Sequence, residues 1–115
     1  YFERMIHHEI FHMIQKSNPN FFDEQKWSLL NKKDFEYAKC STCSDRLNLD
    51  LYKKTEGFLT EYSKSIPSED MAEVFSFLMI DKALVEDKSN DDMILKNKIN
   101  FIKSSLSKID ASFKF

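Results

Sequence analysis

The sequence predicts a mainly helical domain, and three observations support this. Hydrophobic residues make up 42% of the 115-residue chain and charged residues 31%, a balance typical of one globular domain. Gly57 is the only glycine, and Pro19 and Pro67 are the only prolines, so the turn-forming residues that a β-rich domain needs are scarce. Apolar residues also recur at three- and four-residue spacing, which is typical of amphipathic helices.

Two helices are expected in the first third of the chain. The first covers residues 2–16 and ends where Pro19 and its asparagine neighbours favour a turn. Its apolar stripe should face the core: Phe2, Ile6, Ile10 and Met13. A short second helix over residues 23–30 would be capped by Asp23. Its expected anchors are Trp27, Leu29 and Leu30.

Two longer helices are expected in the second half, after an irregular segment over residues 31–65. Within that segment Leu47, Leu49 and Leu51 alternate with polar residues, which permits a short strand. Pro67 and Ser68 form a start signal for a helix over residues 68–88. Its apolar side would hold Met71, Phe75, Leu78 and Val85. Asn90 should cap a last helix over residues 91–113, with a buried stripe of Ile94, Phe101, Leu106, Ile109 and Phe113.

The charge pattern excludes some classes of partner. The net charge is −2, and both signs are interspersed, so no basic stripe indicates nucleic-acid binding. The longest apolar run, residues 74–80, is far too short to span a bilayer, so no transmembrane segment is expected. The oligomeric state stays open.

The first predicted helix carries an HExxH motif, formed by His8, Glu9 and His12. Positions i and i+4 of a helix lie one above the other, so both imidazoles point toward one spot, as two nitrogen ligands of a zinc ion require. Glu9 projects to one side, where it could take a proton from zinc-activated water. His7 points away from the pair, and we expect no metal contact from it. The motif indicates a zinc metallopeptidase.

A catalytic zinc site needs a third protein ligand, and the helix after Pro67 offers two carboxylates. Glu69 and Glu73 lie one turn apart on a helix whose other faces are apolar, so they need partners. The alternative is that acidic residues early in this helix simply suit its dipole.

Residues 61–75 read EYSKSIPSEDMAEVF. This segment resembles the tyrosine followed by E-x-x-A-E-x-F of the anthrax lethal factor-like metallopeptidases and is similar to that of related zinc-binding peptidases of bacteria, all in the gluzincin group. The resemblance covers the first helix and residues 61–75 only. It implies a helical C-terminal lobe of a zincin-like metalloendopeptidase that acts on peptide or protein substrates.

The resemblance also implies a role for each matching residue. His8, His12 and Glu69 would bind Zn²⁺, and Glu9 would act as general base and then acid. Tyr62 would donate a hydrogen bond to the oxyanion, and Glu73 would accept the N–H of a ligand histidine.

The sequence departs from the family pattern at three places. Phe11 and Ser63 stand where the family often has glycine, which could reshape the cleft without touching the metal. The family lays substrate along a strand that precedes the HExxH helix. We therefore expect residues 1–115 to be a catalytic subdomain without its upstream lobe. The resemblance also favours an exported protein, secreted or in the cell envelope.

A competing hypothesis uses the same histidines differently. Cys40 and Cys43 form a CxxC motif, which with His8 and His12 could complete a closed Cys₂His₂ structural zinc site. The chain would then be a non-enzymatic helical interaction domain. The cysteines could instead form a disulfide, stay free thiols or act in redox chemistry. A degenerate peptidase that keeps its ligands but only binds a partner is a further alternative.

Overall fold

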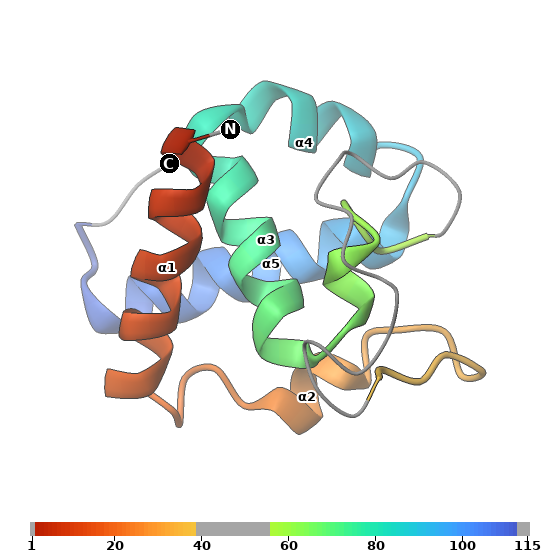
Figure 1. Cartoon of the computed structure of the whole chain (residues 1–115), viewed down its shortest axis with the longest axis horizontal. Helices are drawn as coiled ribbons and strands as arrows, with labels where there is room; N and C mark the ends of the chain where they lie inside the picture. The colour runs from red at the N-terminus through yellow and green to blue at the C-terminus, as the bar shows by residue number, and fades with distance from the viewer. Residues whose placement is uncertain (1, 39–55, 113–115) are drawn as a thin grey trace.

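The computed structural model describes residues 2–38 and 56–112, and within these ranges all the regular elements are helices (Figure 1). In chain order they are α1 (Phe2–Ser17), α2 (Glu24–Ser28), the 3₁₀ helix η1 (Tyr62–Lys64), α3 (Pro67–Ile80), α4 (Lys82–Ser89) and α5 (Met93–Ile109). The predicted mainly helical class is confirmed. None of these helices is long and apolar enough to cross a membrane. The predictions for Cys40, Cys43 and the leucines at 47, 49 and 51 lie outside the described residues.

Helix α3 is the centre of the fold. It contacts α1, α2, α4, α5 and η1, and Figure 1 shows the other elements arranged around it. Every residue from Glu69 to Leu78 is buried, so no side of this helix faces solvent over that length. Pro67 occupies the first turn, where its missing N–H costs nothing. The buried apolar core includes Phe11, Phe22, Trp27, Met71, Phe75, Val85, Leu95, Ile99, Ile102 and Leu106.

The predicted single helix over residues 68–88 is wrong, because the chain forms α3 and α4 with a break at Asp81. Asp81 has φ −151° and ψ 67°, outside the helical region. Its backbone N–H donates to the carbonyl of Phe77 (2.8 Å), which closes α3. Its carboxylate accepts the N–H of Leu84 (3.2 Å) and so begins α4. One residue therefore ends one helix and caps the next.

Helix α5 begins two residues later than predicted. Asp92, and not Asn90, is its N-cap, accepting the N–H of Leu95 (3.0 Å). The helix ends at Ile109. This residue was predicted in the buried stripe, but it is 39% exposed. Of the expected stripe, Leu106 is buried and Phe101 and Ile94 are half-buried, while Phe113 lies outside the described residues. The buried face runs instead through Leu95, Ile99, Ile102 and Leu106.

The predicted orientation of α1 is also wrong. The stripe expected to face the core is exposed: Phe2 by 77%, Ile6 by 45%, Ile10 by 40% and Met13 by 70%. The buried side chains of this helix are Arg4, His8 and Phe11. This face turns toward α3, whose buried carboxylates need polar partners that apolar side chains could not supply.

The short helix α2 is capped as predicted. The Asp23 carboxylate accepts the N–H groups of Gln25 (2.8 Å) and Lys26 (3.0 Å), and Trp27 is fully buried. Leu29, expected as an anchor, is 83% exposed, so that prediction is wrong, whereas Leu30 packs partly against the core.

A buried ion pair connects the first turn of α3 to α5. Lys98 donates to Asp70 Oδ2 (2.7 Å) and to the carbonyl of Gly57 (2.8 Å), and both charged side chains are fully buried. Tyr37 (2.6 Å) and Trp27 (3.0 Å) donate to the same carboxylate oxygen. Gly57 has φ +90°, a conformation that other residues rarely adopt. This cluster fixes the end of α3 on which Glu69 lies.

Candidate metal centre

The candidate centre lies between α1 and α3, which Figure 1 shows side by side. His8 and His12 project from α1 one turn apart, and Glu69 projects from the first turn of α3. His8 is buried, His12 is half-buried and Glu69 is 8% exposed. The structure therefore brings together three side chains that are far apart in the sequence.

The donor atoms of these three residues converge on one spot. The two histidine Nε2 atoms lie 3.1 Å apart, and His8 Nε2 lies 3.3 Å from Glu69 Oε2. His12 Nε2 lies 2.5 Å from Glu69 Oε1. Ligands at about 2.0–2.1 Å from a tetrahedral zinc ion are about 3.3–3.4 Å apart. The His8–Glu69 separation has that value, the two histidine nitrogens are slightly closer, and His12 and Glu69 are at hydrogen-bond distance. The donor types, two imidazole nitrogens and a carboxylate, are those that zinc binds.

The electrostatics of the metal-free centre favour a bound cation. Burial alone would lower the pKa of His8, but hydrogen bonds and charge from Glu69 and Glu73 outweigh it and raise the pKa to about 9. For Glu69, a carboxylic acid, burial alone would instead raise the pKa. Hydrogen bonds from His12, His8 and Tyr62 overcome this and hold that pKa well below its usual range. The carboxylates therefore attract positive charge to this spot, either a proton or a metal ion.

Glu73 forms a second layer behind His8. Its side chain is fully buried and its Oε2 lies 2.9 Å from His8 Nδ1. A hydrogen on Nδ1, donated to Glu73, leaves the lone pair of His8 Nε2 facing the centre. Arg4 donates to the same Oε2 (2.7 Å), and Thr60 donates to Oε1 (2.8 Å).

Arg4 and Thr60 were not expected from the sequence. Arg4 precedes His8 and His12 at four-residue intervals, so its place on the same helical face was a usable signal. The guanidinium of Arg4 also lies 4.5 Å from the ring centre of Phe77. Thr60 comes from an irregular stretch, and the sequence carries no signal for its position.

The remaining predicted residues lie around the rim of the centre. Glu9 is exposed, and its carboxylate lies within 4.8 Å of the donor nitrogens of both histidines. Tyr62, in η1, is half-buried; its side chain hydrogen-bonds Glu69, and its ring centre lies 6.0 Å from that of His8. His7 turns toward Phe75 with ring centres 6.5 Å apart.

Comparison with known proteins identifies the family of the chain. A family model described as "Putative zinc-binding metallo-peptidase" matches residues 1–111. Searches of curated proteins and of solved structures gave no match. The family match spans almost the whole chain, including both helices of the candidate centre. The chain therefore belongs to this family of zinc-binding metallopeptidases.

Proposed function

We propose that this protein is a zinc-dependent endopeptidase in which His8, His12 and Glu69 bind the metal. The observation that supports this best is the convergence of three donor groups of the types that zinc binds, two imidazoles from α1 and a carboxylate from α3, on one spot. Glu9 lies at the exposed edge of the same site, where a water molecule and a peptide can enter.

Each residue of the centre has a chemical task in this proposal. When bound, zinc would polarise the scissile carbonyl and make a water molecule more acidic. Glu9 takes the proton from the attacking water and passes it to the departing amine as the C–N bond breaks. Tyr62 turns from Glu69 to donate a hydrogen bond to the carbonyl oxygen, which gains negative charge. Arg4 and Glu73 hold the His8 ring in place.

Replacing Glu9 tests the proposed chemistry. In zinc-loaded Glu9→Gln, the rate of cleavage of a peptide mixture should fall about 10²- to 10⁴-fold, because the general base is gone. Its zinc content should stay near one equivalent. Glu3→Gln, an exposed change on the same helix, is the matched control and should keep wild-type turnover. Undiminished hydrolysis by Glu9→Gln would refute its role. A zinc-loaded wild type that cleaves no peptide would instead indicate the degenerate peptidase.

Zinc content of two further variants tests the ligand set. Glu69→Gln should weaken zinc binding strongly, because it removes a ligand, whereas Cys40→Ser should leave zinc content unchanged. The opposite pattern would favour the closed Cys₂His₂ site. Mass spectrometry under native conditions, with zinc titrated against a competing chelator, measures both effects.

A further inference from the structure

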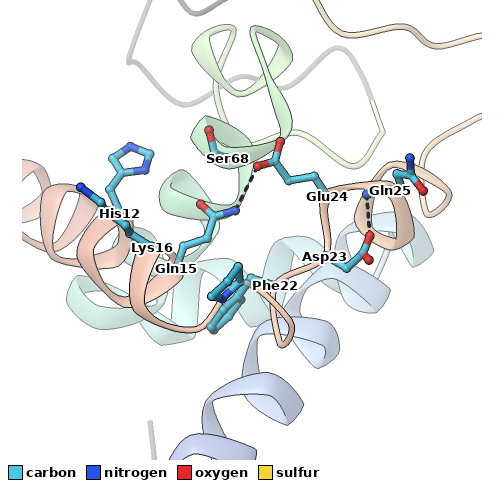
Figure 2. A pocket seen from close by; sticks show the side chains of 9 residues that line it. His12, Gln15, Lys16, Phe22, Asp23, Glu24, Gln25 and Ser68 are labelled. Atoms are coloured by element: carbon cyan, nitrogen blue, oxygen red, sulfur yellow. Dashed lines mark hydrogen bonds between the residues drawn. The ribbon is translucent and has the colours of Figure 1, made fainter.

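A pocket opens directly beside the candidate metal centre. It has a volume of about 490 Å³, within the range of ligand-binding pockets, and His12 lines both it and the centre. Three elements form its walls: the end of α1, the loop and first residues of α2, and Ser68 at the start of α3 (Figure 2). Its polar lining includes His12, Gln15, Lys16, Asp23, Glu24 and Ser68.

The charges that line this pocket are not equally available to a ligand. Asp23 is occupied as the cap of α2, accepting two backbone N–H groups. Lys16 is exposed, and Figure 2 shows its amine turned away from Glu24. Glu24 makes no ion pair with any residue in the described ranges and accepts only a long bond from Gln15 (3.4 Å). Its carboxylate is therefore the available negative charge of the pocket.

The direction of the Glu24 side chain also suits a ligand. In Figure 2 its carboxylate points toward Gln15 and Ser68, across the space between α1, α2 and α3. The amide oxygen of Gln15 and the hydroxyl of Ser68 can accept hydrogen bonds beside it. A group that donates several hydrogen bonds and carries positive charge would satisfy all three.

We propose that this pocket is the subsite for a long, positively charged substrate side chain, arginine or lysine, with Glu24 as its counter-ion. A peptide lying across the centre at His12 would place one side chain, on one side of the scissile bond, in the pocket. The proposal deepens the proposed function and rests on it, because it assumes that the substrate is a peptide. It makes the protein selective for basic sequences.

Pairs of peptides that differ by a single charge test this subsite. Arginine and citrulline are nearly the same in shape, but only arginine is charged. We would place each of them in turn at every position near the scissile bond and measure kcat/KM with the zinc-loaded protein. At one position arginine should be preferred about five-fold, the upper range for a solvent-exposed ion pair. Glu24→Gln should remove this preference, and Glu24→Lys should reverse it toward a glutamate peptide.

The matched control is Glu36→Gln, which neutralises an exposed carboxylate that does not line the pocket. It should keep the arginine preference of the wild type. An arginine-to-citrulline ratio that is the same in wild type and in Glu24→Gln would overturn the assignment.

A binding measurement separates this proposal from the proposed function. Zinc-loaded Glu9→Gln can be titrated with the same fluorescent peptides without turnover, and fluorescence anisotropy gives their affinities. Tighter binding of the arginine peptide that depends on Glu24, together with no hydrolysis by the wild type, would support the subsite and refute the peptidase activity. Hydrolysis by the wild type with equal binding of both peptides would support the peptidase activity and refute the subsite.

Discussion

Glu73 joins the fold to the candidate centre, and Glu73→Gln should weaken both. The glutamine keeps the size of the side chain but removes its charge. The buried guanidinium of Arg4, 3% exposed, then lies beside a neutral amide. The His8 ring also loses the carboxylate that accepts its Nδ1 hydrogen.

The magnitude follows from the burial of the Arg4–Glu73 pair. Removing one partner of a buried ion pair costs about 3–5 kcal/mol. We take the lower end, about 3 kcal/mol, because Arg4 keeps its contact with the Phe77 ring. For a chain of this size about 3 kcal/mol corresponds to a fall of about 12 °C in Tm. Zinc affinity should fall about 10- to 100-fold, as when the hydrogen-bond partner of a ligand histidine is lost.

Circular dichroism of the metal-free protein during heating measures the first effect, and titration against a chelator measures the second. Thr60→Val is the comparison variant. It removes the hydroxyl that donates to Glu73 Oε1 and also bonds Ser63, at a cost of about 1.5–3 kcal/mol. It leaves the Arg4–Glu73 pair and the Glu73–His8 contact in place, so zinc affinity should fall less than in Glu73→Gln. A Tm for Glu73→Gln within about 4 °C of wild type would show that the pair adds less than about 1 kcal/mol. Unchanged zinc affinity would refute the support of His8 by Glu73.

Two further predictions concern buried charges. Metal-free protein should lose about 3 kcal/mol of stability as the pH rises from about 6.5 to about 9, because folded His8 keeps its proton up to a pKa of about 9, above its value in the unfolded chain. Urea unfolding at several pH values measures this loss. If the free energy of unfolding of His8→Gln falls with pH as it does in the wild type, the loss does not come from His8. Lys98→Met removes the cation beside buried Asp70 and should cost about 3–5 kcal/mol. The double variant Lys98→Met/Asp70→Asn should regain part of the lost free energy of unfolding, measured with urea. A double variant no more stable than Lys98→Met would show that the unpaired Asp70 charge is not the cause of the loss.

The parts of the molecule that were predictable from sequence depend on local pattern. Helical spacing indicated α1 and the core of α3, and a side-chain cap indicated the start of α2 at Asp23. The HExxH motif indicated where His8 and His12 would meet, because spacing on a single helix sets that geometry. The resemblance added Glu69, which the structure places against both histidines.

The wrong orientation of α1 and the unexpected role of Asp70 arose where distant charges decide which face is buried. The apolar side of α1 was expected inside, but its polar side packs on α3 because Arg4 and His8 neutralise and hydrogen-bond Glu73. Asp70 looked like a residue that suits the helix dipole, yet Lys98, 28 positions later, makes it a fully buried anchor. A single sequence does not reveal which distant charges pair. The roles of the site residues stay predictions until the variants are measured.

The placement of the centre on two helices has a consequence for the lifetime of the chain. His8 and Glu69 are 61 positions apart in the sequence, and no other described helix contributes a proposed ligand. A zinc ion would therefore act as a cross-link that fastens the N-terminal helix to the middle of the protein, and its binding energy would add to folding energy. When zinc is scarce, α1 should detach more often and become accessible to other proteases. Zinc supply would then govern the survival of the protein as well as its activity.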